Sequence, residues 1–276
     1  MGWLRHAATQ VLPAWFRSLL RRGYRGVKPF FYLGNRVECP CCGARYARFL
    51  PFGHPPRRNA WCARCGSLER QRALALLLLR NRPLLESRPR LLHFAPERAL
   101  RELLSTSCSQ YLTTDYAERA GLSLRMDITR LALRETAVDA IVCIHVLEHI
   151  PDDRAALHEL YRVLRPGGWG ILQVPLDPAR EVTYEDPSIT SPEDRRRHFL
   201  QENHVRLYGR DFAARLRQAG FIVETHPLGA SLAPPERARY GIPEDEEFFL
   251  CRKPRASGEH VPLQPPGPPP ERPGQP

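Results

Sequence analysis

The feature that most constrains the fold is a regular alternation of short apolar runs and amphipathic stretches between residues 90 and 252. The run Val138–Val146 is nearly all apolar, as expected of a central parallel strand that is covered on both faces. Strands that alternate with helices predict βαβ units and therefore a doubly wound α/β fold. The last two strands have no predicted helix between them, which favours an antiparallel hairpin at one edge. The expected strands are 90–95, 110–115, 122–127, 138–146, 170–174, 221–225 and 247–252.

A second constraint comes from two cysteine pairs with the spacing Cys39-x2-Cys42-x19-Cys62-x2-Cys65. Each pair is followed by a glycine, which permits the tight turn that aims two thiolates at one ion. Four thiolates close a tetrahedral zinc site with no open position, so the ion is expected to be structural. We therefore predict a four-cysteine zinc ribbon over residues 37–67, with His54 as a less favoured alternative ligand.

The basic charge is confined to the first third of the chain. Residues 1–90 hold 18 basic and 3 acidic residues (+15), whereas residues 91–276 hold 23 and 27 (−4). This asymmetry suggests RNA or another anionic surface as a partner for residues 1–67. All but two of the 41 basic residues are arginine, which looks like a coding bias and weakens that inference.

The two ends of the chain are expected to lie outside the globular part. Residues 1–36 form a basic leader, interpreted as a targeting segment, an amphipathic arm or a solvated helix. Residues 254–276 are rich in proline and should be a disordered tail. No apolar run reaches the roughly 18–20 residues of a membrane span. With no secretory signal, the cysteine pattern favours a reducing compartment, so we expect a cytoplasmic protein.

Two runs in the main domain carry a family resemblance. They are DAIVCIHVLEHIPDD at 139–153 and YRVLRPGG at 161–168, which is followed by a strand. Together they closely resemble the class I S-adenosylmethionine-dependent methyltransferases, of the kind called methyltransferase type 11, and the domain expected is residues 68–253. The resemblance implies a methyltransferase with a Rossmann-like seven-stranded sheet, mostly parallel, with an antiparallel edge hairpin. It also implies S-adenosylmethionine as the cofactor.

In an open parallel sheet the ligand binds beyond the carboxyl ends of the strands, where the strand order reverses. Asp115 ends the second strand and can accept hydrogen bonds from both ribose hydroxyls. Asp127 ends the third strand and can accept one from the adenine amine, with Ile128 against the ring. His145 and Val146 end the fourth strand, at the methionine end of the cofactor. The complete set of expected cofactor residues is Phe94, Ala95, Pro96, Glu97, Asp115, Tyr116, Asp127, Ile128, His145 and Val146.

The first loop departs from the family pattern. The first strand of such domains usually ends in an acid and a glycine-rich loop, but here Phe94-Ala95-Pro96-Glu97 contains no glycine. His93 stands where the acid normally binds the cofactor's ammonium group, and Glu97 is expected to take over that role. The alternative is a non-catalytic module that binds nucleic acid or a partner protein.

Methyl transfer mainly requires that the cofactor be aligned with the acceptor, and a general base is needed only if the acceptor must lose a proton. The candidates for that base are His145, Glu148 and His149, which could instead be capping and packing residues. Residues 175–208 form a long polar segment without obvious structure, and such loops often contact substrate. The acceptor itself, a small molecule such as a sugar metabolite or an RNA, is left open. The expected substrate contacts are His198, His204, Arg206 and Tyr208.

Overall fold

The computed structural model describes residues 32–53, 55–117 and 121–255. The predicted leader and tail lie mostly outside these ranges, as does His54. Within them, no helix is both long enough and apolar enough to cross a membrane.

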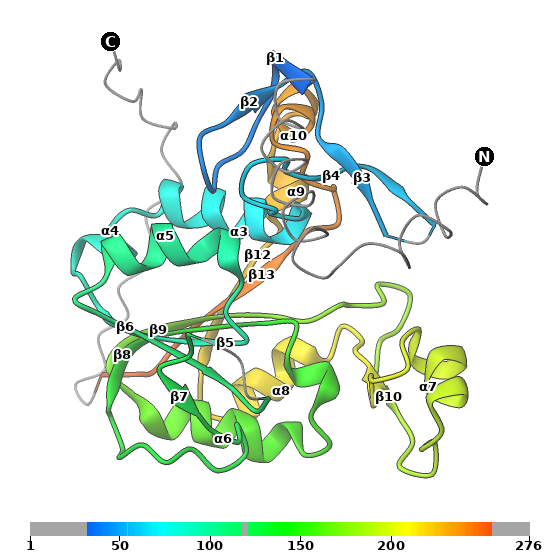
Figure 1. Ribbon diagram of the computed structural model, residues 1–276. Coiled ribbons are helices and arrows are strands. Elements are labelled where there is room, and N and C mark those ends of the chain that lie inside the picture. Colours follow the sequence, from blue (N-terminus) through cyan, green and yellow to red (C-terminus); the bar gives the residue numbers. More distant parts are fainter. Residues whose placement is uncertain (1–31, 54, 118–120, 256–276) are drawn as a thin grey trace, which may run out of the picture.

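The centre of the molecule is a seven-stranded sheet with the order β12-β13-β9-β8-β5-β6-β7 (Figure 1). Strand β13 is antiparallel to both neighbours, and the other pairs are parallel. The predicted mostly parallel sheet with an antiparallel edge is therefore confirmed. The strands are β5 Arg90–Phe94, β6 Gln110–Asp115, β7 Leu124–Arg125, β8 Val138–Ile144, β9 Leu164–Gln173, β12 Ile222–His226 and β13 Phe248–Arg252.

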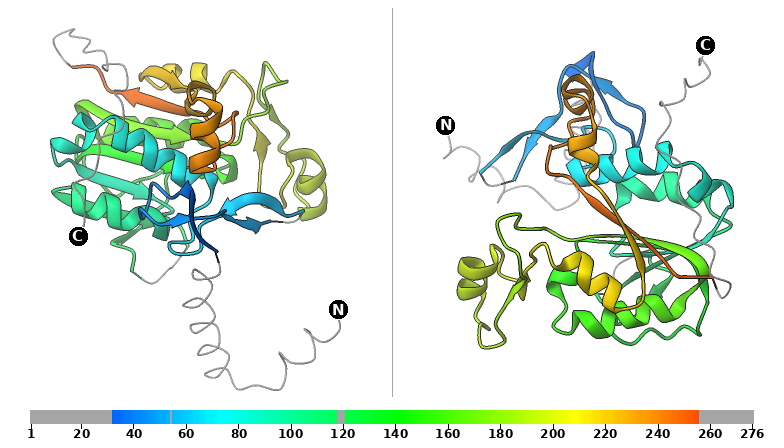
Figure 2. Two further views of the ribbon diagram at one scale, coloured as in Figure 1. Left: turned by 90° about the horizontal axis from the view of Figure 1, so that it is seen from above. Right: turned by 180° about the vertical axis from the view of Figure 1, so that it is seen from behind.

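Helices cover both faces of the sheet. Helices α3 (Glu69–Arg80), α4 (Pro83–Glu86) and α5 (Arg98–Ser107) lie on one face, and α6 (Asp153–Val163) and α8 (Phe212–Gln218) lie on the other (Figures 1 and 2). Successive side chains of a strand point to opposite faces. Ala140 and Val142 accordingly pack under α3 and α5, whereas Ile141 and Cys143 pack against α6 and α8.

A small ribbon lies on the outer side of α3 (Figure 1). It consists of two antiparallel pairs, β1 (Leu33–Glu38) with β2 (Arg45–Tyr46) and β3 (Leu50–Phe52) with β4 (Arg57–Trp61). Strand β1 begins inside the range predicted as the leader. Residues 73–78 of α3 are all buried, because the helix is enclosed between the ribbon and the sheet.

The stretch between the last two strands was expected to hold no helix, and this prediction was wrong. The structure has α9 (Leu228–Ser231) and α10 (Pro234–Tyr240) there. Proline at the start of α10 and left-handed Gly241 (φ +58°) at its end suit helix termini. The helix lies along β1, where Arg239 forms an ion pair of 2.7 Å with Glu38. Contact with the ribbon therefore stabilises α10, although its seven residues are too few to show a helical pattern in the sequence.

Two other expectations need correction. Segment 175–208 contains a two-stranded sheet, β10 (Tyr184–Glu185) with β11 (Arg206–Leu207), and helix α7 (Pro192–Phe199) between them. The fifth strand of the domain begins at Leu164 rather than at Gly170, because the Leu-Arg-Pro-Gly-Gly run already pairs with β8 across an irregularity in the register.

Candidate active site and metal centre

The strand order reverses between β5 and β8. From β5 the chain moves to β6 and β7 on one side, and it then returns to place β8 and β9 on the other. Helices that follow these strands lie on opposite faces, and in open sheets of this kind ligands bind at such a reversal, beyond the carboxyl ends of the strands. The residues at this switch point are the ones that can contact a bound nucleotide-like cofactor.

Both strands at the switch point are followed by a non-glycine residue with left-handed backbone. Ala95 follows β5 with φ +44°, and His145 follows β8 with φ +53°. Such a conformation costs on the order of 1–3 kcal/mol outside glycine and tends to occur at functional sites. Ala95 donates its amide to Thr114 and His145 donates its amide to Gln173, each on a neighbouring strand. The sharp turn that glycine would give in the first loop is therefore made by Ala95.

Glu97 precedes α5 and lies beside the fully buried His93. The Nε2 atom of His93 is 3.2 Å from Oε2 of Glu97, and its Nδ1 atom is 2.8 Å from the Tyr111 hydroxyl. The amide of Gln71 donates to the other Glu97 oxygen at 3.4 Å. Burial opposes ionisation of Glu97, but contact with His93 outweighs it and lowers the pKa. A carboxylate thus stands at the end of β5, with 19% of its side chain exposed.

Asp115 ends β6 as expected, whereas Asp127 lies two residues beyond β7, which is shorter than predicted. Asp115 accepts a hydrogen bond from the Ala117 amide at 3.1 Å. Asp127 is exposed and accepts from both the amide and the hydroxyl of Thr129, each at 2.8 Å. Tyr116 is 70% exposed beside them. These contacts stabilise local turns. The geometry of the two aspartates therefore fits a role in forming turns as well as a role in binding a ligand.

The remaining expected cofactor residues take different positions. Phe94 and Ile128 belong to the hydrophobic core, and any contact they make with a cofactor would come from the edge of that core. Pro96 and Val146 are half-buried at the ends of β5 and β8. The chemistry of this set nevertheless fits S-adenosylmethionine, because three carboxylates at adjacent strand ends can serve its ammonium, ribose hydroxyls and adenine amine.

The expected general bases gather in and next to a short 3-10 helix, η2 (Leu147–His149), which follows β8. Glu148 is 1% exposed, and its Oε1 atom lies 3.2 Å from Nδ1 of His145. His204 joins them from the distant segment before β11, with its ring edge-to-face on that of His149 at 4.8 Å. Burial lowers the pKa of His204. The sequence analysis named all four residues but gave them different roles, with His145, Glu148 and His149 as candidate bases and His204 as a substrate contact.

Two of the expected substrate contacts, Arg206 and Tyr208, lie inside the protein and anchor η2 instead. Arg206 is 3% exposed and donates to the carbonyls of Leu147 at 3.1 Å and Pro151 at 2.8 Å, and to that of Ile150. Tyr208 is fully buried and donates to Asp153 at 2.8 Å. Their polar atoms are engaged within the protein, so the structure makes them positioning residues.

His198, the other expected substrate contact, is exposed on α7. Its Nδ1 atom lies 3.0 Å from the Tyr184 hydroxyl. Helix α7 and the β10-β11 pair project to one side of the sheet (Figure 1). His198 therefore contacts residues of this projecting lobe, whereas His204 reaches the η2 cluster.

Sequence reasoning missed Gln173 and Glu246 at the same edge of the sheet. Gln173 ends β9, is 4% exposed, and donates through its amide to Glu246 and to the Glu247 carbonyl. Burial raises the pKa of Glu246. No motif marks Glu246, which lies in the loop before β13. The pairing of β13 with β9 brings it next to Gln173.

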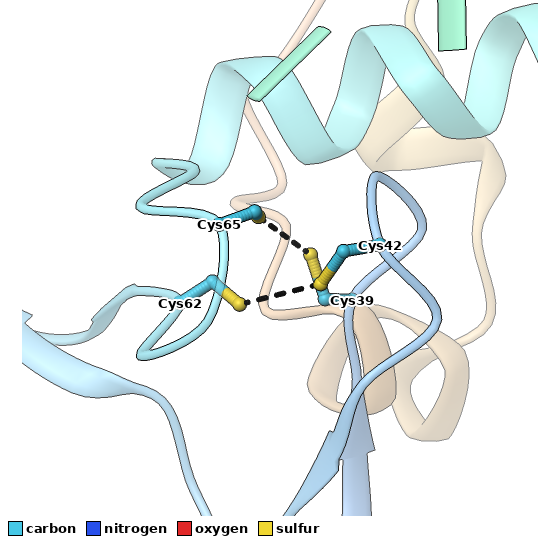
Figure 3. A group of neighbouring side chains, drawn as sticks. All are labelled: Cys39, Cys42, Cys62 and Cys65. Carbon is cyan, nitrogen blue, oxygen red and sulfur yellow. Dashed lines mark hydrogen bonds between the residues drawn. The ribbon is translucent and has the colours of Figure 1, made fainter. Parts of the chain in front are cut away.

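The four ribbon cysteines converge as their spacing predicts (Figure 3). The Sγ atoms of Cys39 and Cys65 are 3.6 Å apart, those of Cys42 and Cys62 are 3.8 Å apart, and all four lie within 4.8 Å of one another. Zn–S bonds of about 2.3 Å in a tetrahedron put the sulfurs about 3.8 Å apart. The donor set and its spacing therefore fit zinc.

The glycine after each cysteine pair forms the tight turn that the sequence predicts. Gly43 and Gly66 have φ of +69° and +78° and donate their amides to the carbonyls of Cys39 and Cys62. Cys41 turns away from the cluster, with its thiol 3.4 Å from the Gln71 carbonyl on α3. The ribbon is thus built as a closed structural site.

Comparison with known proteins gives one family. Residues 94–172 match the family model described as a methyltransferase domain, which spans β5 to β9 and includes both motifs singled out above. A search of characterised proteins found no significant sequence match.

Solved structures with a similar fold include three methyltransferases. An S-adenosylmethionine-dependent methyltransferase from Mesorhizobium loti is 16% identical, with 63% of this chain and 98% of that one covered and a TM-score of 0.43. One from Archaeoglobus fulgidus is 14% identical, with 64% and 92% covered and a TM-score of 0.43. The 1,6-didemethyltoxoflavin N1-methyltransferase of Burkholderia thailandensis is 17% identical, with 63% and 78% covered and a TM-score of 0.41.

Proposed function

We propose that this chain, which carries a methyltransferase domain on a class I sheet, transfers a methyl group from S-adenosylmethionine to a nucleophilic acceptor. The observation that carries the proposal is the row of carboxylates Glu97, Asp115 and Asp127 after three adjacent strands, next to the switch point. Each can serve one polar group of the cofactor. Eight free cysteines suit a reducing compartment, which we take to be the cytoplasm.

The protein's own part in the reaction is to bind and align. The cofactor supplies the electrophilic methyl group when bound, and the protein holds it in line with the acceptor. His145, at the end of β8, and Glu148 and His149 in η2 stand where the acceptor would approach. One of them takes the acceptor's proton if the acceptor is a hydroxyl or a protonated amine. The acceptor is a small molecule, such as a sugar, or an RNA.

A non-catalytic role is the second candidate, and a specific observation favours it. The first loop has no glycine, and the Glu97 carboxylate is already engaged by His93 and Gln71. A module of this kind would hold nucleic acid or a partner protein and would not bind the cofactor. The retained acids at the ends of β6 and β7 favour the enzyme.

The proposal is tested by the binding of S-adenosylhomocysteine to Asp115→Ala and to a matched control. Loss of a hydrogen bond from a charged group should weaken binding by about 1.5–3 kcal/mol, which is roughly tenfold or more. Asp186→Ala removes a carboxylate with a similar turn, since Asp186 accepts from the Ser188 amide and hydroxyl. This control should bind like the wild type. Equal affinity of Asp115→Ala and wild type would remove Asp115 from the site.

A further inference from the structure

The cluster of Glu148, His149 and His204 has the composition of a metal site. One potential ligand atom from each residue lies within 4.8 Å of the others. Ligand atoms about 2.1 Å from one tetrahedral ion lie about 3.4 Å apart, so side-chain adjustments of roughly an ångström would bring the three atoms to that spacing. It is separate from the four-cysteine site in sequence and in donor chemistry.

The two imidazoles are held in the form that binds metals. Nδ1 of His149 lies 3.1 Å from the Asn203 carbonyl, and Nδ1 of His204 lies 3.2 Å from the Phe199 carbonyl. A carbonyl oxygen can only accept, so both Nδ1 atoms carry the proton and both Nε2 atoms keep a lone pair. Metal-binding histidines almost always have such an outer partner, which fixes the ring and its tautomer.

The carboxylate lacks the partners that its burial demands. Glu148 is 1% exposed, and among the described residues neither of its oxygens accepts a hydrogen bond of good geometry. Its Oε1 atom lies 3.2 Å from Nδ1 of His145, which is the nearest cationic partner among the described residues. A buried carboxylate costs several kcal/mol unless it is paired or coordinates a metal. A cation between Glu148 and the two imidazoles would stabilise the buried carboxylate.

The surrounding fold keeps the three ligands together although they come from distant segments. The amide of Val205 donates to the Glu148 carbonyl at 2.9 Å, which ties the His204 segment directly to η2. Arg206 binds three carbonyls of the loop from Leu147 to Pro151. Arg206 in turn pairs with Glu185 of β10 at 2.8 Å. The β10-β11 lobe thus positions one ligand against the other two.

We propose that Glu148, His149 and His204 bind a divalent transition-metal ion, in a second metal site besides the ribbon. Two imidazoles and one carboxylate suit zinc, manganese or iron, and three protein ligands leave positions open. An oxygen of the methyl acceptor, such as a hydroxyl, can occupy an open position, where the ion would make it more acidic. That last role rests on the proposed function, whereas binding of the ion does not.

The test counts ions on the full-length protein without cofactor, after equilibrium dialysis against buffered zinc. Wild type should hold two zinc ions per chain by elemental analysis. His149→Ala and His204→Ala should each hold one, because the ribbon ion remains. His158→Ala, which removes an exposed histidine on α6, should still hold two. A wild-type content of one, or loss of an ion in the His158 control alone, would overturn the proposal.

A second measurement starts from the wild-type protein. Mn²⁺ is a poor partner for thiolates but accepts imidazole and carboxylate ligands, so it reports the second site in protein that was given only one equivalent of zinc, which the ribbon thiolates take up. The electron paramagnetic resonance signal of free Mn²⁺ should fall by one ion per wild-type chain. Binding should weaken more than about tenfold in His149→Ala. An unchanged Mn²⁺ signal together with a single zinc ion refutes the site, and failure to bind S-adenosylmethionine would leave this result unaffected.

Discussion

At the scale of single residues, Asp139 shows that a residue of the family motif can stabilise the sheet far from the expected cofactor site. It opens the DAIVCIHVLEH run, but it lies at the amino end of β8, opposite to the switch point. Its carboxylate accepts the Arg90 amide at 2.7 Å and pairs with Arg165 Nε at 2.9 Å. It therefore connects the starts of β5, β8 and β9. Burial tends to raise the Asp139 pKa, but these contacts outweigh it and lower the pKa.

Asp139→Asn should destabilise the protein by about 1–3 kcal/mol at pH 7, measured by urea unfolding. Because the folded pKa is lowered, the stabilisation is present above the unfolded pKa of about 3.9 and is lost only as pH falls through the folded value. The cost of the substitution should therefore be the same at pH 7 and pH 5.5. A cost that shrinks between these two pH values would contradict a lowered pKa.

The sequence predicted residue types at the site better than it predicted their roles. His204, Arg206 and Tyr208 look alike in sequence as polar groups in one segment. In the structure His204 lies next to Glu148 and His149, whereas Arg206 and Tyr208 donate hydrogen bonds that fix the position of η2. Only the burial and the hydrogen bonds that follow from tertiary packing separate the three, and neither is visible in a pattern of residues.

At the scale of elements, we expect the ribbon to depend on a bound metal more than on its core. About 30 residues cannot bury enough apolar surface to fold alone, so an ion at the four cysteines should supply much of the stability.

Cys65→Ser should therefore remove about one zinc per chain and expose the ribbon to protease. Cys41→Ser is the matched control, because Cys41 lies in the first pair but its thiol faces α3. It should keep the ribbon zinc. Elemental analysis decides between them, and an unchanged zinc content in Cys65→Ser would contradict the four-cysteine site.

Arg72 on α3 joins the ribbon to the α/β domain. Its side chain is fully buried beneath Phe49, with 4.0 Å between the guanidinium carbon and the ring centre. It donates to five backbone carbonyls, three in the ribbon region and two at the end of α10: those of Asn59, Ala60, Ser67, Tyr240 and Gly241. The two modules and α10 thus share one buried cation.

Arg72→Met should cost about 3–5 kcal/mol, since it strips several buried carbonyls of their donors at once. Arg82→Met, at an exposed position shortly after α3, should change stability by no more than about 0.5 kcal/mol. Chemical unfolding of zinc-loaded protein measures both. Equal stability of the two variants would show that Arg72 does not hold the modules together.

The elements that the sequence predicted are those whose own pattern is strong. The seven strands are short apolar runs between turn residues, and all seven were expected. Helices α7, α9 and α10 were not, because they have between four and eight residues and contain or follow proline. Packing against the ribbon or within the projecting lobe stabilises them, and such contacts between distant segments leave no local periodicity.

At the scale of the whole molecule, the basic first third of the chain contains a groove in the ribbon. A groove of about 870 Å³ has five basic and aromatic residues in its lining, beside smaller apolar side chains and Asn59: Tyr32, Arg36, Arg48, Phe49 and Arg58. The guanidinium of Arg48 lies 5.6 Å from the ring centre of Tyr32. Basic and aromatic groups together suit single-stranded nucleic acid.

If this groove binds RNA, affinity for a single-stranded oligonucleotide should fall steeply as salt is raised, and Arg58→Ala should weaken it. Arg154→Ala, at an exposed position of α6, is the control and should bind like the wild type. Fluorescence anisotropy at several salt concentrations measures this. Absence of binding at low salt, or a flat salt response, would mean that the aromatic residues only pack the ribbon and would favour a small-molecule acceptor.

An enzyme of this kind must bind S-adenosylmethionine although its first loop has no glycine. Calorimetric titration of the zinc-loaded, full-length protein with S-adenosylmethionine and with S-adenosylhomocysteine tests this. We predict that both bind with micromolar affinity and a stoichiometry of one per chain. Absence of heat with both ligands, in protein whose ribbon zinc is confirmed, would contradict the enzyme and favour the non-catalytic module.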